Sequence, residues 1–487
     1  MMLFPPGQHC TQSRSPKICF HDPITLDSSF AGFSDQEIHT ENGLAEPYKF
    51  VLKGKSDSVI DLSHTVLQLK CKILDTNDKP ITLDRRRSGP VLTLAGNPIS
   101  SLWSRIETRI NDKIINVDSA RNIPHKGIIE DYITHSQDHR AAPQGLRQFT
   151  WTVEEQHVDK FRFPRTIYEE DNDSFYDGQE VEFVGRPPVD FLLANNYLSP
   201  RSTLALTFFR QPDYYVIRNR RHIDCKLIVT SVKLHIRRLQ LAQSVLPLLP
   251  QLGQDRQEVY HSKLGIVREY QIPKGSRRWD QAVILGDGLL PKQVIIGFIG
   301  ADAFMGHSDQ GEIDPCYFYN KRLNHVCLRV NGRQFPKKPY RLLDPLAQDD
   351  KIGYFYTQPI DTQPMSIVDA FIESLRQSKP KTVKTKRSLK VSSLRAYYGL
   401  FDQLGLTRHH VSRTWFDWGR RLYAFNLTPD KRSIMNPNLL HSKRGPLSID
   451  VGFENGLSET MVMVVYMLYD QVINITGPTG FPVEEQF

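Results

Sequence analysis

Several residue patterns in this sequence resemble parts of catalytic or metal sites, and each of them is incomplete. Gly286-Asp287-Gly288 lacks the following Gly, Lys or Ser of a phosphate-binding loop, so we interpret it as a turn. His409 and His410 are adjacent, and adjacent side chains on a helix point about 100° apart. They need a third ligand from elsewhere to hold a metal, and we interpret them as a solvent-facing pair. The acidic run 169–173 resembles a fragment of a calcium loop without its closing Glu, and we expect a solvated loop there.

Nucleophile and zinc motifs are missing from the whole sequence. It contains no G-x-S-x-G, no H-E-x-x-H and no C-x-x-C. The six cysteines are widely spread, and Cys71 and Cys327 lie in apolar-alternating stretches, where a free Cys behaves as a small hydrophobic residue. We therefore expect a non-catalytic protein without cofactor or metal, folded in a reducing compartment.

The strongest charge feature is a basic segment. Eight cations and no carboxylate lie between Arg376 and Arg395, as many as the formal net charge of +8 of the whole chain. One interpretation is binding to DNA phosphates; the other is a solvated loop or a nuclear-import signal, not needed for folding. The candidate contact residues are Lys379, Lys381, Lys384, Lys386, Arg387 and Lys390. Further on, Trp415 and Trp418 stand near arginines and could stack on bases, or could pack against the start of a strand.

Period-two alternation dominates the rest of the chain. Leu67, Leu69, Cys71 and Ile73 alternate with polar residues, which predicts a strand with one buried face. Asn111-Asp112 and Asn331-Gly332 are typical of hairpin turns. The alternation stops and then starts again near Cys225. Short strands separated by turn residues predict an all-β protein made of two sandwiches.

Helices are expected in a few excursions only. Apolar residues with helical spacing predict helices at about 367–375 and 394–404, and a shorter one at 126–136. We expect an N-terminal arm at 1–44, a first sandwich at 45–222 and a second at 223–487. The second would carry a basic helical excursion at about 365–412 and a short C-terminal tail. The longest apolar run, 461–469, has nine residues against the roughly 20 that span a bilayer, so no membrane span is expected.

Several ordered segments resemble one family, the double jelly-roll major capsid proteins of Polinton/Maverick elements and adintoviruses. The matching segments are Tyr48–Gly54, Val59–Thr65, Asn97–Ser104, Glu182–Arg186, Asn196–Leu198, Leu290–Phe298, Asp302–Gly306 and Leu422–Asp430. They follow the family's order from about residue 45 to 475. The chain departs from the family at Asp112, where Gly is usual, at Asn426, where Asp is common, and in the longer and more basic region 365–412.

The resemblance implies a structural protein with two consecutive eight-stranded jelly-rolls. Three chains would form a pseudo-hexameric capsomer, and capsomers, with penton and minor capsid proteins, would build an icosahedral shell around double-stranded DNA. The protein would then be found in the virion after assembly in the host cell, in its nucleus. Two other classes stay open on the residues alone: a β-sandwich that binds carbohydrate, and one that binds nucleic acid through the basic segment.

Overall fold

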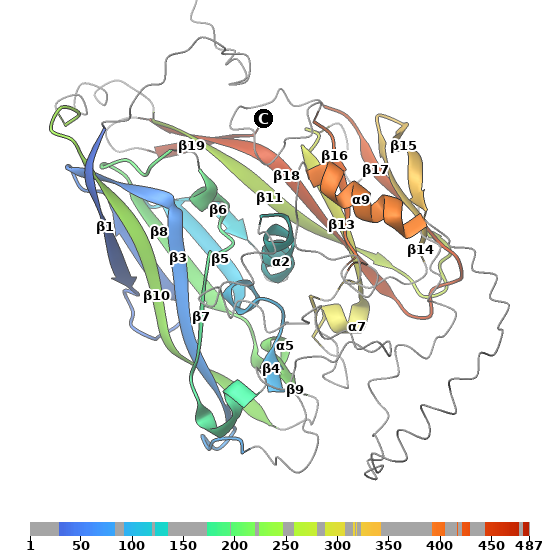
Figure 1. Ribbon diagram of the computed structural model, residues 1–487, viewed down its shortest axis with the longest axis horizontal. Coiled ribbons are helices and arrows are strands. Elements are labelled where there is room, and N and C mark those ends of the chain that lie inside the picture. Colours follow the sequence, from blue (N-terminus) through green and yellow to red (C-terminus); the bar gives the residue numbers. More distant parts are fainter. Residues whose placement is uncertain are drawn as a thin grey trace, which may run out of the picture.

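The structure is a computed structural model that describes part of the chain. It covers residues 29–82, 92–118, 122–134, 173–194, 196–219, 224–246, 258–279, 288–306, 315–316, 318, 323–341, 392–404, 416, 421–428, 444–476 and 481–486. Antiparallel sheets make up most of this part, arranged as two sandwiches side by side (Figure 1).

The first sandwich consists of two four-stranded sheets. One sheet contains, in spatial order, β1 (Phe30–His39), β10 (Cys225–Leu241), β3 (Ser58–Asp75) and β7 (Val181–Gly185). The other contains β2 (Tyr48–Lys53), β8 (Thr203–Arg210), β5 (Trp103–Ile110) and β6 (Lys113–Asp118). A separate two-stranded sheet joins β4 (Leu92–Leu94) to β9 (Ile217–Asn219).

The second sandwich also consists of two sheets. The first has the order β11 (Glu258–Ile272), β18 (Met461–Thr476), β13 (Gln293–Gly300) and β16 (Tyr423–Asn426), and β19 (Phe481–Gln486) pairs with the end of β18. The other has the order β12 (Arg278–Trp279), β17 (Leu447–Phe453), β14 (Leu323–Val330) and β15 (Arg333–Arg341).

The two sandwiches share one connectivity. When the eight main strands of each are numbered in chain order, both have one sheet in the order 1-8-3-6 and a second in the order 2-7-4-5. This is the order of a jelly-roll, in which the first and last strands pair beside each other. The predicted double jelly-roll is therefore confirmed, and the repeat exists in topology although no repeat is visible in the sequence.

The predicted boundary between the sandwiches at 222/223 is wrong. Residues 225–241 form β10, which pairs with β1 and β3 and so completes the first sandwich. The boundary of the arm at 44 is also wrong, because β1 starts at Phe30. Alternation identifies a strand but not its partner. The inward side of β1 carries Gly32, Ser34 and Gln36 between Phe30 and Ile38, which interrupts the apolar pattern. The first sandwich spans 30–241 and the second 258–476, with β19 beyond it.

The strand faces and hairpins agree with the sequence. Leu67, Leu69, Cys71 and Ile73 are fully buried on β3. Asn111 and Asp112 have φ of 47° and 66° between β5 and β6, and Asn331-Gly332 has φ of 50° and 73° between β14 and β15. These left-handed conformations match the right-handed twist of the two strands that each turn connects.

Two longer helices lie in corresponding connections. The helix α2 (Asn122–Thr134) follows β6, and α9 (Ser392–Leu404) precedes β16, so each lies between the fifth and sixth strands of its sandwich. They confirm two of the predicted helices; the third, at 367–375, lies outside the described residues. The remaining short helices are α1 (Pro98–Ser101), η3 (Asp173–Gly178), η4 (Asp190–Leu193), α5 (Asp213–Val216) and α7 (Ala301–Phe304).

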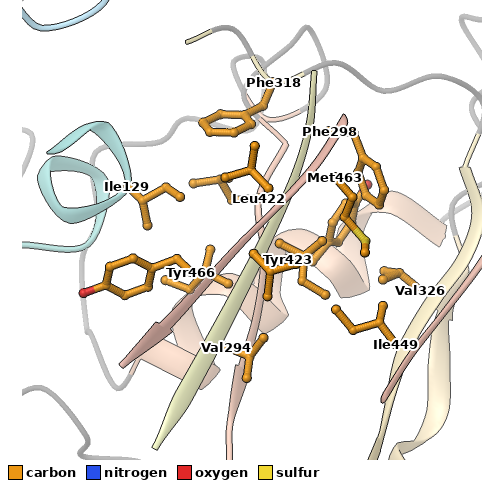
Figure 2. Packing of buried hydrophobic residues seen from close by; sticks show 14 of the residues in the cluster. Ile129, Val294, Phe298, Phe318, Val326, Leu422, Tyr423, Ile449, Met463 and Tyr466 are labelled. Carbon is orange, nitrogen blue, oxygen red and sulfur yellow. The ribbon is translucent and has the colours of Figure 1, made fainter. Parts of the chain in front are cut away.

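Each sandwich has its own apolar core, and each core takes residues from the other sandwich. Ile128 and Ile129 of α2 pack in the core of the second sandwich, and Figure 2 shows Ile129 beside Tyr466 of β18. In return, Tyr260 and Ile473 pack in the core of the first. The helix α2 lies between the sandwiches (Figure 1), so the two jelly-rolls form one packed unit.

Candidate interaction surfaces

The candidate residues from the sequence mostly lie outside the described part of the chain. The basic residues Lys379, Lys381, Lys384, Lys386, Arg387 and Lys390 belong to 342–391, which the structure does not describe. The same is true of His409, His410, Trp415, Trp418 and the acidic run up to residue 172. Among the described residues, no group of three or more His, Cys, Asp or Glu side chains is placed to hold a metal ion. None of the described helices is long and apolar enough to cross a membrane.

The contact between the sandwiches contains a buried ion pair that the sequence did not reveal. Lys126 Nζ on α2 lies 2.7 Å from Asp190 Oδ2 on η4, and the two side chains are 1% and 2% exposed. The same carboxylate oxygen accepts a hydrogen bond from Gly265 N on β11 at 3.1 Å. The Ser262 hydroxyl donates to the Asp190 carbonyl at 2.8 Å. Asp190 thus connects α2 and η4 of the first sandwich to β11, the first strand of the second sandwich.

Further ionisable groups continue this contact along β18. Tyr466 donates a hydrogen bond to Glu130 of α2 at 3.1 Å, and Lys292 pairs with Asp470 in a buried ion pair. Burial lowers the pKa of Lys263 to about 8; Lys292 adds to this shift, while Asp470 and Glu130 oppose it. The contact between the two sandwiches therefore contains several charged and polar groups. Their hydrogen bonds and ion pairs determine the relative position of the two sandwiches.

The outer face of the β1-β10-β3-β7 sheet is covered by cross-strand charge pairs. Arg237 Nε donates to Asp35 Oδ1 at 3.0 Å, and this hydrogen bond lowers the pKa of Asp35. Next along the strands, Lys233 Nζ lies 2.6 Å from Glu37 Oε1, which also contacts His39. Pairs of this kind on exposed strands contribute little stability, so the face is built for contact with water or with a polar partner.

On the outer face of the second sandwich, the carboxylate of Asp450 is bound by two arginine side chains. Asp450 on β17 accepts hydrogen bonds from Arg278 at 3.0 Å and from Arg329 at 2.9 Å, and His325 lies 3.3 Å away. Burial alone would raise the pKa of Asp450, but these three donors outweigh it and hold the pKa below its usual value. Arg278 and Arg329 are half exposed, so this part of the face is cationic.

Exposed aromatic side chains occur at both ends of the molecule. Phe33 on β1 is 65% exposed, with the Arg237 guanidinium 5.0 Å from its ring centroid. At the other end, Tyr398 on α9 is 67% exposed. Large exposed aromatics are enriched where proteins bind one another, so both positions are candidate contact points. The sequence did not identify them as contact points, because neither strand alternation nor helical spacing distinguishes a buried face from a contact face.

Comparison with known proteins shows which solved structures share this fold, but it does not assign the chain to a sequence family. No protein-family model and no curated protein matches the sequence. A chain from the 3.5 Å cryo-EM structure of the Sputnik virophage is similar, with a TM-score of 0.55 at 9% identity, covering 98% of this chain and 93% of that chain. A chain of the PBCV-1 virus capsid has a TM-score of 0.51 at 8% identity, covering 95% of this chain and 99% of that chain. The shared property is the fold. It extends over both jelly-rolls, because nearly the full length of each chain is matched.

Proposed function

We propose that this chain is the major capsid protein of a double-stranded DNA virus or virus-like element of the Polinton/Maverick and adintovirus type. Three copies form a pseudo-hexameric capsomer, and capsomers tile an icosahedral shell together with penton and minor capsid proteins. The protein is then a non-catalytic component of the virion, assembled in the nucleus of the host cell.

One observation carries this proposal: two jelly-rolls of identical connectivity stand side by side in one chain. Six similar sandwiches from three chains can then surround one axis with nearly equivalent contacts, as closed symmetric oligomers require. The full-length similarity to a chain of the PBCV-1 virus capsid and the ordered motifs from residue 45 to 475 support the same function.

Light scattering on the concentrated protein, followed by electron microscopy, tests the proposal. We expect a stable trimer with threefold, nearly hexagonal particles, and shells under assembly conditions. An obligate trimer of this kind should bury more than about 2,000 Å² between each pair of chains. A folded protein that stays monomeric at high concentration would contradict the proposal.

Within this function, we assign the basic segment to the packaged DNA. Lys and Arg side chains without nearby carboxylates bind phosphates without sequence preference and release counterions. Replacing Lys381, Lys384, Lys386, Arg387 and Lys390 by Ser should leave trimers and shells intact while the DNA content of the shells falls. Unchanged DNA content would exclude this role, and loss of the trimer would make the segment structural.

A further inference from the structure

The outer faces of two corresponding sheets carry the same row of basic side chains. The fourth strand is β5 in the first sandwich and β14 in the second, and each runs directly into a two-residue turn. Counted back from these turns, Arg109 and Arg329 occupy the same position, and so do Arg105 and His325. All four side chains lie on the outer face, because the residue after each of them packs in an apolar core. The two jelly-rolls therefore share this row as well as their connectivity.

A nearly buried carboxylate lies at the centre of each row. In the first sandwich it belongs to Glu107 of β5, which pairs with Arg105 and accepts a hydrogen bond from Arg109 at 3.2 Å. In the second sandwich, Cys327 occupies the corresponding position on β14. There the carboxylate comes from Asp450, the residue opposite Cys327 on β17. The carboxylate has thus moved to a neighbouring strand while it keeps its place in the row.

Each of these carboxylates is shared by two arginines. Glu107 contacts Arg105 and Arg109, and Asp450 contacts Arg278 and Arg329 in the same way. Counted over these side chains, each site has one positive charge more than it has negative charges. The other outer face of the first sandwich differs, because its cations have a carboxylate each: Arg237 pairs with Asp35, and Lys233 with Glu37.

Guanidinium groups that are held in this way are prepared to bind a second carboxylate. Arg109 and Arg329 each direct Nη2 to the inner carboxylate, at 3.2 Å and 2.9 Å, while the two side chains stay 39% and 48% exposed. A guanidinium has five N–H donors, so further donors remain for a ligand. Because the side chains are already fixed, binding costs less conformational entropy. The planar fork of donors also matches the two oxygens of a carboxylate.

Apolar groups beside the arginines favour a peptide as the ligand. Ile114 of β6 is the partner of Arg109 in the register and is 42% exposed. The Arg105 guanidinium lies 5.2 Å from the ring centroid of Phe209, which is half-buried on the same outer face. Nucleic acid is bound through cations that follow several phosphates. Each of these sites is instead a short cluster with a carboxylate inside it, which suits single acidic side chains.

We propose that these two outer faces bind acidic peptide segments of a second protein. An Asp or Glu carboxylate of the segment is bound by Arg109 in the first sandwich and by Arg329 in the second, and its neighbouring side chains contact Ile114 or the corresponding part of β15. The site on each sandwich does not depend on oligomerisation. Resting on the proposed function, a trimer presents the site six times, so one kind of acidic segment fits all six positions.

Fluorescence anisotropy on the full-length protein, with labelled deca-glutamate as the probe, tests this site. Arg109→Gln with Arg329→Gln should weaken binding about tenfold or more, because both surplus charges are lost. The matched control, Lys70→Gln with Lys226→Gln, also removes two positive charges, but from cations that each contact a carboxylate of their own. It should change the affinity less than about twofold. An equal loss in both variants overturns the site, because the probe would then respond to net charge alone.

A second pair of variants tests the geometry of the site. Arg109→Lys with Arg329→Lys keeps the charge and removes the fork of donors, so binding should still weaken severalfold. Full affinity in this variant overturns a site built for carboxylates. A double-stranded oligonucleotide that binds more tightly than the peptide, and that loses affinity in the Gln variant, would make the faces a nucleic-acid surface and overturn the proposal.

Light scattering on the same samples separates this inference from the proposed function. A trimer that does not bind the acidic peptide overturns the site and leaves the capsid function in place. A monomer that binds the peptide through Arg109 and Arg329 supports the site and overturns the capsid function. Circular dichroism of each variant shows that a loss of binding does not come from unfolding.

Discussion

Lys126 and Asp190 form an ion pair of 2.7 Å at the contact between the two jelly-rolls, and both side chains are almost completely buried. Both belong to the first sandwich, but the carboxylate also accepts the amide of Gly265 from the second. A buried charge is costly unless it is paired, so this arrangement holds only while both sandwiches are in place. The pair therefore reports on the docking of the two halves.

We predict that Asp190→Ala lowers the free energy of unfolding by about 3–5 kcal/mol, because it leaves Lys126 buried without its counter-charge. The double variant Lys126→Met with Asp190→Leu should lose much less, since neither charge remains. Urea unfolding at one fixed protein concentration measures both. The exposed carboxylate gives the control: Asp35→Ala should change the free energy of unfolding little, because exposed ion pairs contribute little stability. Equal losses for Asp190→Ala and the double variant would show that the pair is not the source of the effect.

This ion pair also shows where sequence reasoning stopped. The alternation of Leu67 to Ile73 predicted a strand and its buried face, because that pattern depends only on the local pleat. The place of β10 depends on its pairing with β1 and β3, which are distant in sequence. No motif in the sequence distinguishes Lys126 on α2, and its burial follows from packing against the second sandwich. Residue patterns predicted strands, helices and the all-β fold class. The charged groups at the contact between the sandwiches could be identified only from the tertiary structure.

The pH dependence of stability should report on Lys263. Burial lowers its pKa to about 8 in the folded protein, from 10.5 for a free side chain. Between these values the unfolded chain binds more protons than the folded one, so this group makes stability rise with pH from about 8 to 10.5. Below pH 8 the penalty for burying the charge is present in full.

We therefore predict that Lys263→Met raises the melting temperature at pH 7 and that the gain shrinks as the pH approaches 10. Differential scanning calorimetry of both proteins across this range checks the prediction. Lys233→Met on the outer face of β10 is the control for the removal of a lysine that pairs with a carboxylate at the surface. A gain that stays constant from pH 7 to 10 would mean that Lys263 does not titrate in this range.

Acid stability should depend on Asp450. Its pKa is held below the usual value by Arg278, Arg329 and His325, which outweigh the opposing effect of burial. A carboxylate of this kind stabilises the fold above its unfolded pKa, and the contribution is lost as the pH falls through the folded pKa. Asp450→Asn should thus reduce stability by about 1 kcal/mol at pH 7, and the difference should be smaller at pH 3. Urea midpoints at the two pH values measure it; a difference that persists in acid would assign the loss to packing instead.

The core of the second sandwich is closely packed around Gly297 on β13. A Cβ added at Gly297 would lie 2.3 Å from the ring of Phe318 and 3.0 Å from Leu422. Phe318 and Leu422 are fully buried, so neither side chain has room to give way. We predict that Gly297→Ala costs about 1–3 kcal/mol, as overpacking of a dense core does. Gly288→Ala is the matched control, because nothing lies within 4 Å of a Cβ at that position, and its effect should stay near zero. Thermal unfolding of the two variants decides the matter: similar melting temperatures would show that the sheet moves away from Phe318 at no cost.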